Sequence, residues 1–174
     1  IGIDPNPKHA DMARRLGADE VIQPDLSGAD PIAADEQVVR AIKAATQGIG
    51  ADVSMEMSGF NSAFNTAIGS TRRGGDVILF GIKDGPVVVE SFPRLVMNGI
   101  DLHSVIGRQI FETWTVTKSL LEDRSNRIQD LIWEVILGGG DDTIVDIADW
   151  EAGSFESCIT SHPKAIIRFA VWDG

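Results

Sequence analysis

The sequence contains no tyrosine, one cysteine and three histidines among its 174 residues. Without tyrosine, no reductase mechanism in this chain can use that residue as a general acid. Cys158 has no second cysteine with which to form an internal disulfide, which fits a reducing compartment such as the cytosol. The histidines are far apart, and there is no CxxC pair or HExxH motif, so we expect no self-contained zinc centre. P-loop and GxSxG motifs are also missing.

Positive charge is scarce as well. Fifteen lysines and arginines stand against 26 aspartates and glutamates, which gives a formal net charge of −11. Such a chain repels phosphate backbones and anionic lipid surfaces, so we predict no nucleic-acid partner and no membrane-surface role. The longest apolar run, at residues 77–80, is far shorter than the roughly 18 residues of a spanning helix, and the first residues do not resemble a secretory signal. We therefore expect a cytoplasmic protein.

Strand-like and helix-like patterns alternate along the chain, and 43% of the residues are apolar, enough for a core. Residues 77–80 are apolar on both faces, which is typical of a strand buried in a parallel sheet. The alternation predicts an α/β fold, a Rossmann-like, doubly wound, mostly parallel sheet. We expect strands at residues 1–3, 21–22, 51–57, 77–80, 100–106, 143–147 and 165–171, helices at 8–16, 38–45, 63–68, 93–97, 110–121 and 128–136, a turn at 72–75, and irregular structure at 149–162.

In an open α/β sheet the ligand crevice lies outside the carboxyl ends of the strands, so the residues that follow the strands are candidates for a binding site. Small or polar residues follow several of them: Asp4, the Ser58-Gly59 pair, and Gly81 before Ile82. Asp4 stands directly before a helix, where dinucleotide-binding folds place the acid that accepts hydrogen bonds from the ribose hydroxyls. A structural aspartate at a turn is the alternative.

The glycine fingerprint of such folds should lie about 20 residues before that acid, yet only three residues precede Asp4. Gly48-Ile49-Gly50 follows a helix instead of a strand, so we interpret it as a turn. We therefore expect that the first strand and the glycine-rich turn are missing, that the sequence is part of a longer chain, and that it binds a dinucleotide weakly or not at all by itself.

Three segments carry a resemblance: residues 2–7 (GIDPNP), 12–19 (MARRLGAD) and 51–59 (ADVSMEMSG). They are similar to the second strand, the helix after it and the middle strand of the cofactor domain of the zinc-dependent medium-chain dehydrogenases. The most specific segment is residues 107–114 (GRQIFETW), which resembles the Gly-Arg-x-x-Phe-Glu-Thr-Trp segment of the L-threonine 3-dehydrogenase branch. The Ile-Thr-His segment of that branch is not visible near residues 141–146.

The resemblance implies NAD as the cofactor. Asp4 matches the ribose-binding acid, whose charge would repel a 2′-phosphate, and His9 occupies the place of an arginine near the adenosine, either touching the cofactor or remaining an exposed helix histidine. Arg108 matches a position that touches a cofactor phosphate or forms a structural ion pair. The remaining implied contacts lie at the strand ends, with Gly81 allowing the backbone to approach the cofactor: Ser58, Gly59, Phe80, Gly81, Ile82, Val105 and Ile106.

The same resemblance assigns residues 1–163 to the nucleotide-binding domain and residues 164–174 to a strand that returns to a catalytic domain. The zinc ligands and the pocket for a small alcohol or amino-acid substrate would lie in that other domain, which this sequence does not contain. The complete enzyme would transfer hydride from a secondary alcohol to NAD, and the chain alone would be inactive. The edge strand at residues 100–105 implies a homodimer or homotetramer.

Two other interpretations stay open. The chain could be the cofactor half of a zinc-free quinone or enoyl reductase, which would act on a carbonyl or double bond. It could also be a non-catalytic fragment that associates with copies of itself. Zinc ligands upstream of Ile1 would favour the dehydrogenase, and their absence would favour the reductase.

Overall fold

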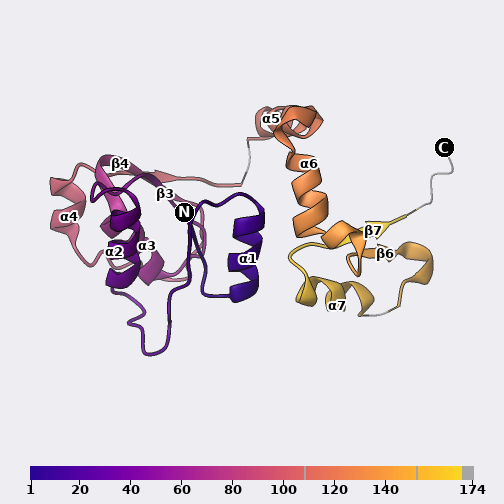
Figure 1. Ribbon diagram of the computed structural model, residues 1–174, viewed down its shortest axis with the longest axis horizontal. Helices are drawn as coiled ribbons and strands as arrows, with labels where there is room; N and C mark the ends of the chain where they lie inside the picture. Colours follow the sequence, from indigo (N-terminus) through magenta and orange to yellow (C-terminus); the bar gives the residue numbers. More distant parts are fainter. Residues whose placement is uncertain (108, 152, 170–174) are drawn as a thin grey trace. The chain divides into compact units, whose positions relative to one another are not determined.

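The computed structural model describes residues 1–107, 109–151 and 153–169. The chain forms two compact units (Figure 1). The first comprises Ile1–Arg14 and Ala18–Gly107, and the second comprises Arg15–Gly17 and Arg108–Gly174. Strands and helices alternate through the first unit, whereas helices predominate in the second.

The predicted alternation is present along the first 107 residues. All strand pairs there are parallel, in one sheet of order β1-β2 and another of order β3-β4-β5, which confirms the Rossmann-like α/β class. The elements are β1 (Gly2–Ile3), α1 (Pro7–Arg15), β2 (Val21–Ile22), α2 (Glu36–Ala45), β3 (Ala51–Glu56), α3 (Asn61–Ser70), β4 (Thr71–Leu79), α4 (Phe92–Met97) and β5 (Asp101–Ser104).

The two sheets of the first unit are not joined by hydrogen bonds. Among the described strands, β1 pairs only with β2, and β3 pairs only with β4. In the doubly wound order 3-2-1-4-5-6, the place between the strands that correspond to β1 and β3 belongs to the strand followed by the glycine-rich turn. That strand and turn are not found in this sequence, which explains why the parallel arrangement is divided at this position.

Strand β4 differs from the sequence-based expectation. A turn was expected at residues 72–75, but the strand begins directly after α3. The register shows where the turn-like residues lie. Ala51 lies opposite Thr71 and Val53 lies opposite Asp76, so the single residue 52 of β3 faces residues 72–75 of β4. The additional residues of β4 form a bulge, with Gly74 at a φ of +62°. Residues 72–75 therefore form a bulge within β4, and the strand continues to Leu79.

The core of the first unit lies between α3 and the β3-β4-β5 sheet. Its buried residues are Phe64, Ala67, Ile68, Val77 and Ile100. Helix α2 packs on α3 through a buried stripe at Val38, Val39 and Ile42. Asp35 caps α2, because its carboxylate accepts hydrogen bonds from two backbone N–H groups of the first turn.

Two asparagines of α3 bind the loops around them. Asn65, which is 4% exposed, donates from its side-chain amide to the carbonyls of Ile32 (2.7 Å) and Val88 (3.0 Å), and accepts from the N–H of Glu90 (3.1 Å). Asn61 donates to the Val88 carbonyl and accepts from its N–H, both at 2.7 Å. The segment before α2 and the segment after β4 are therefore both fixed to this helix.

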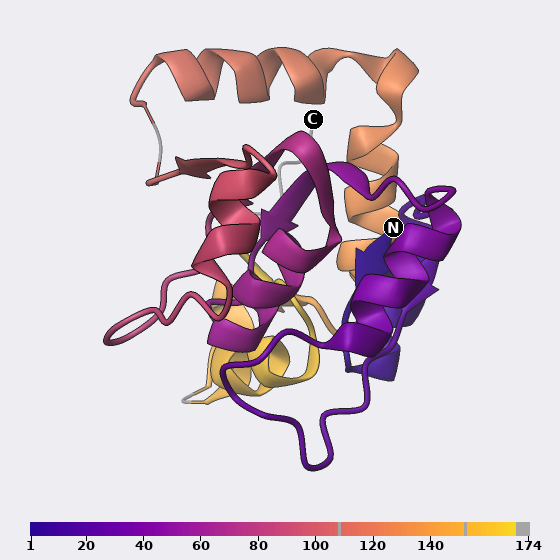
Figure 2. The same ribbon diagram turned by 90° about the vertical axis from the view of Figure 1, so that its left-hand side faces the viewer.

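The second unit contains two helical segments separated by a bend, drawn in salmon and orange in Figure 2, followed by a short parallel strand pair. Its elements are α5 (Glu112–Glu122), η1 (Arg124–Asn126), α6 (Ile128–Leu131), η2 (Ile132–Ile136), η3 (Gly138–Gly140), β6 (Ile144–Asp146), η4 (Ile147–Asp149), α7 (Ser154–Ser161) and β7 (Ile166–Arg168). The helix expected at residues 128–136 is present, with a π-helical second half, η2, that continues α6.

Helix α7 was not predicted, since residues 149–162 were expected to be irregular. Its serines and threonine favour non-helical structure locally, and Cys158 is the one buried residue among residues 155–161, where burial is described, so the apolar pattern is weak. In the described part of the chain, no helix combines the length and apolar character needed to cross a membrane. The domain boundary at residues 163/164 stays a prediction.

Candidate cofactor site at the strand ends

The three strands β3, β4 and β5 end at the same level. Glu56 lies opposite Leu79, and Leu79 lies opposite Ser104. The N–H of Val105 then donates to the Leu79 carbonyl at 2.9 Å, which keeps the chain in register one residue beyond β5. Seven of the predicted cofactor residues therefore follow one edge of one sheet: Ser58, Gly59, Phe80, Gly81, Ile82, Val105 and Ile106.

The turns after β3 and β4 are packed against each other through two glycines. A Cβ on Gly81 would overlap the backbone nitrogen of Gly59 and would lie 2.8 Å from that of Ser58. Gly59 has a φ of +75°, and a Cβ there would overlap the Ile82 carbonyl oxygen. From the sequence, the missing Cβ of Gly81 was expected to allow an approach by the cofactor. In the structure, the space is already needed for the approach of one turn to the other.

Glu56 joins these two turns. Its backbone carbonyl accepts hydrogen bonds from the N–H groups of Phe80 (2.9 Å) and Gly81 (3.0 Å). Its side chain binds the turn that follows β3, where Oε1 accepts from the N–H groups of Ser58 (2.8 Å) and Gly59 (2.9 Å) and from the Ser58 hydroxyl (2.5 Å). No role was predicted for Glu56, although an acidic residue at the end of an apolar strand is a visible signal.

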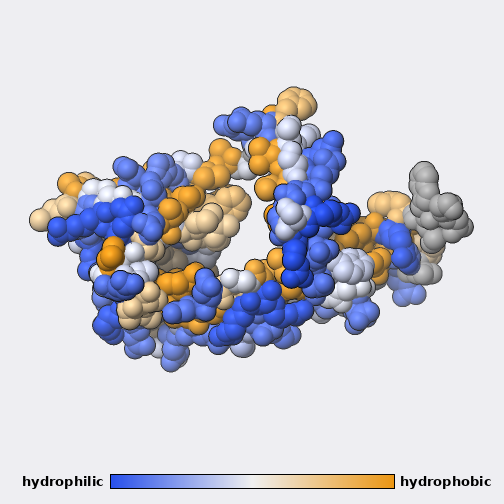
Figure 3. Space-filling model, turned by 45° about the horizontal axis from the view of Figure 1, so that its top comes forward, coloured by the Kyte–Doolittle hydropathy of each residue, from blue (hydrophilic) through white to orange (hydrophobic). Residues whose placement is uncertain are grey.

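Apolar side chains remain uncovered beyond the strand ends. Ile82 is 90% exposed and Ile106 is 94% exposed, and Phe80 and Val105 are about half exposed. The space-filling view shows hydrophobic residues at the surface of the first unit (Figure 3). Exposed apolar side chains that gather beside glycine-containing turns are typical of a surface that binds a flat, partly apolar molecule.

Asp4 lies at the carboxyl end of β1, in the other sheet of the first unit. Its Oδ1 accepts from the N–H of Asn6 at 2.8 Å, and its Oδ2 lies 3.2 Å from Nδ1 of His9 on α1. Both side chains are partly exposed. The structure therefore brings Asp4 and His9 together as a pair. Arg108, the last predicted contact, lies outside the described residues.

The described residues contain no group of three or more His, Cys, Asp or Glu side chains that could hold a metal ion. His103 is paired with Asp76 across β4 and β5, with Nε2 and Oδ1 2.7 Å apart. Cys158 is buried, and its thiol donates to the Asp142 carbonyl. These residues are occupied by structural contacts.

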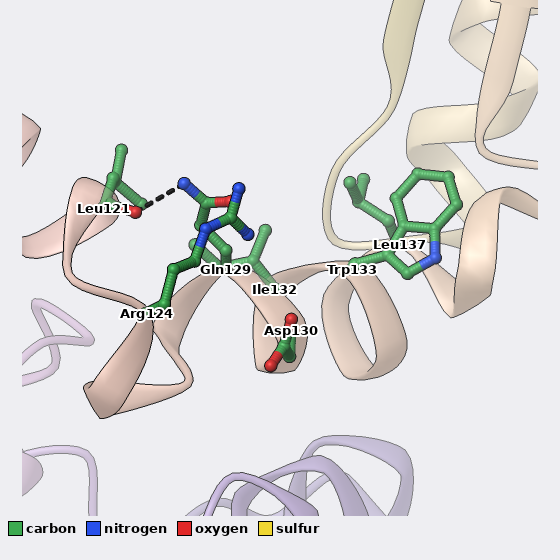
Figure 4. Close-up of a pocket in the computed structure, with 7 residues that line it drawn as sticks. All are labelled: Leu121, Arg124, Gln129, Asp130, Ile132, Trp133 and Leu137. Carbon is green, nitrogen blue, oxygen red and sulfur yellow. Dashed lines mark hydrogen bonds between the residues drawn. The ribbon is translucent and has the colours of Figure 1, made fainter.

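The second unit contains an open pocket at the bend between α5 and α6 (Figure 4). The side-chain amide of Gln129 donates to the Leu121 carbonyl across it. The pocket is lined by Leu121, Arg124, Gln129, Asp130, Ile132, Trp133 and Leu137. None of these residues was predicted as a site residue, and the lining offers one cation, one carboxylate and mostly apolar atoms, with no arrangement of catalytic groups.

A family model described as zinc-binding dehydrogenase matches residues 1–123. The chain belongs to this family. The matched residues include β1 to β5, so the strand ends described above lie within the segment that the family model covers. The resemblance found in the sequence is thus confirmed, and the chain corresponds to the cofactor-binding domain of zinc-type alcohol and threonine dehydrogenases.

Two curated relatives illustrate the branch. The L-threonine 3-dehydrogenase of Caldanaerobacter subterraneus subsp. tengcongensis is 32% identical over 131 residues, which are 75% of this chain and 35% of that protein. The L-threonine 3-dehydrogenase of Bacillus licheniformis is 30% identical over 132 residues, which are 76% of this chain and 36% of that protein. The chain therefore spans about a third of the length of these relatives.

Solved structures show the same fold. An alcohol dehydrogenase from Thermotoga maritima matches with a TM-score of 0.70 at 18% identity, over 95% of this chain and 41% of that chain. A 2R,3R-butanediol dehydrogenase from Bacillus subtilis matches with a TM-score of 0.62 at 19% identity, again over 95% of this chain and 41% of that chain. At these identities the likeness concerns the fold and not the substrate.

Proposed function

We propose that the chain is the NAD-binding part of a zinc-type dehydrogenase that oxidises a small secondary alcohol, with L-threonine or a related amino-acid alcohol as the favoured substrate class. The observation that carries the proposal is that β3, β4 and β5 end in register with one another. The glycine-containing turns and the exposed Ile82 and Ile106 therefore lie at one edge of a parallel sheet. Family membership and the names of the relatives support the reaction and the substrate class.

In this function the strand ends orient the nicotinamide ring. Ile82, Val105 and Ile106 would form an apolar wall against one face of the ring, so that hydride arrives from the opposite face. Zinc held elsewhere in the full-length protein would polarise the alcohol, and the nicotinamide would accept the hydride. The residues of this chain supply binding and orientation, and they exclude water from the covered face.

Asp4 would bind the adenosine ribose. Its carboxylate is partly exposed at a strand end, and Oδ2 retains acceptor capacity beyond its contact with His9. A ribose diol donates hydrogen bonds to such a carboxylate, whereas a 2′-phosphate is repelled by it. We therefore expect the full-length protein to bind NAD at least ten times more tightly than NADP, about 1.4 kcal/mol.

The test is titration of both cofactors into the full-length wild-type protein and its Asp4→Ser variant. The variant should bind NAD more weakly and should lose most of the preference over NADP, because both the ribose acceptor and the repulsive charge are gone. Asp11→Ser, which removes the same charge from an exposed position on α1, is the matched control and should keep the preference. Equal wild-type affinities for NAD and NADP would contradict the proposal.

The proposal also includes self-association. β5 is the outer strand of its sheet, all four of its residues are exposed, and the described residues provide no further strand to pair with it. A second copy related by a two-fold axis would satisfy that edge. The single cysteine supports a cytosolic location, where thiols stay reduced.

A further inference from the structure

Glu56 stands out among the acidic residues because its side chain is buried within the candidate site. The residue is 6% exposed. Oε1 receives three hydrogen bonds, two from backbone N–H groups and one from a hydroxyl. Hydrogen bonds from N–H and O–H groups to a carboxylate are about twice as strong as those between neutral groups, so this oxygen is a strong acceptor for the turn after β3.

The other oxygen of this carboxylate points toward the neighbouring strand end. Oε2 lies 3.2 Å from the N–H of Gly59 and would lie 2.5 Å from a Cβ on Gly81. The side chain of Glu56 therefore fills the space directly behind the Gly81 backbone, while its main-chain carbonyl binds the N–H of the same glycine. One residue thus sets the conformation of the turn after β3 and supports the turn after β4.

We propose that Glu56 is a positioning residue for the nicotinamide half of the cofactor. This inference rests on the proposed function. The carboxylate holds the Ser58-Gly59 turn in the conformation that packs on Gly81, and this packing sets the position of Ile82. Without the Glu56 carboxylate, the two N–H groups and the hydroxyl of the Ser58-Gly59 turn lose their acceptor. The turn then changes conformation, and Ile82 moves from its position in the apolar wall that faces the nicotinamide ring.

The experiment compares NAD affinity in the full-length wild-type protein, Glu56→Ala and Glu56→Gln, at a temperature well below unfolding. Glu56→Ala removes every side-chain acceptor and should weaken NAD binding about tenfold or more. Glu56→Gln retains an oxygen for the three donors and loses the charge, so its affinity should lie between those of the wild type and the alanine variant. A higher NAD affinity for Glu56→Gln than for Glu56→Ala would show that Glu56 acts as a hydrogen-bond acceptor for the turn.

The control for a general loss of stability is Ile42→Val. Ile42 is buried in the stripe by which α2 packs on α3, and it is not one of the strand-end residues. This variant should lower the unfolding temperature without changing NAD affinity. The Glu56 variants should change NAD affinity and also kcat, because a misplaced ring slows hydride transfer even when NAD is saturating.

Ser58→Ala provides a second variant in case Glu56→Ala does not fold. It removes one of the three donors and should weaken NAD binding less than Glu56→Ala does. If the wild type binds NAD and both Glu56→Gln and Ser58→Ala bind it with unchanged affinity and kcat, the assignment of Glu56 is overturned while the proposed function stands. If the wild type does not bind NAD, the proposed function and this inference fail together.

Discussion

At the scale of single residues, the structure assigns the glycines of the site a packing role that the sequence could not show. Glycine at a strand end is compatible with a close approach by a ligand or by another part of the chain. Only the structure distinguishes the two, because the atoms that a Cβ on Gly81 would meet belong to residues 56–59, more than 20 positions away in the sequence.

Gly81→Ala should therefore destabilise the first unit. The added methyl group would overlap the backbone of Gly59, which has no flexible end that could move aside. Overpacking of this kind costs about 1–3 kcal/mol, so the urea midpoint of the full-length protein should fall. Gly85→Ala is the comparison without overlap, since no atom lies within 4 Å of a Cβ there, and it measures the cost of a side chain at a φ of +79°, about 1–2 kcal/mol. An unchanged midpoint for Gly81→Ala would contradict the packing.

Asp4 and Glu56 show what can be predicted from the sequence at this scale. Asp4 could be singled out as a candidate because its position after a strand and before a helix is visible in the local pattern. The role of Glu56 depends on the conformation of the turn that follows it and on Gly81 of the next strand, so the local pattern does not reveal it.

At the scale of elements, the order and type of the strands and helices in the first unit could be predicted, because each has an apolar pattern of its own. The bulge in β4 and the division between the two sheets could not, since both depend on which strands pair. Helix α7 was missed because its sequence has low helix propensity and its apolar face is small.

Asn65→Ala should lower the free energy of unfolding by about 1–3 kcal/mol, because it leaves the Ile32 carbonyl and the Glu90 N–H without their side-chain partner and removes one of the two amide donors to the Val88 carbonyl. Asn98→Ala, at the end of α4, is the matched control, because its side chain makes none of these hydrogen bonds. Urea titration measures both. Equal effects of the two substitutions would show that the α3 contacts do not hold the loops.

The strand pair of the second unit should give a pH-dependent contribution to stability. The side-chain hydrogen bond from Arg168 lowers the pKa of Asp146, and the two residues form a two-pronged ion pair between β6 and β7. A carboxyl whose pKa is lowered in the folded state stabilises that state above about pH 4, and the contribution is lost as the pH falls through the lowered value. The pair is exposed, so the effect is small.

Asp146→Asn should accordingly lower the unfolding temperature slightly at pH 7, and the difference from the wild type should shrink as the pH falls below about 4 and through the lowered pKa of Asp146. Thermal melts over this pH range measure it. Arg168→Lys keeps the charge without the planar fork and should give a smaller decrease at pH 7. A difference that grows toward low pH would show that the pair does not stabilise the fold.

At the scale of the whole molecule, the family, the fold class and the acidic charge could all be recognised from the sequence, since they depend on many residues together. The substrate could not, because the chain covers about a third of the relatives, and the residues that would touch an alcohol are not among those that define this domain.

Self-association is the prediction that belongs to this scale. Leu102→Glu places a charge in the middle of β5, and in a two-fold strand pair the same charge from the partner lies close to it. We expect the full-length protein to change from a dimer or tetramer to smaller species in sedimentation experiments. Leu26→Glu, in an exposed loop, should leave the assembly intact. A wild-type monomer would contradict the prediction.

The side-chain amides of Asn61 and Asn65 on α3 have a thermodynamic consequence for the binding of the cofactor. They order the segment that continues from Ile82 before any nucleotide arrives. A loop that becomes ordered only on binding loses conformational freedom at that moment, and affinity falls accordingly. Here most of that entropic loss occurs during folding, so calorimetry on the full-length protein should find only a small unfavourable entropy of loop ordering when NAD binds.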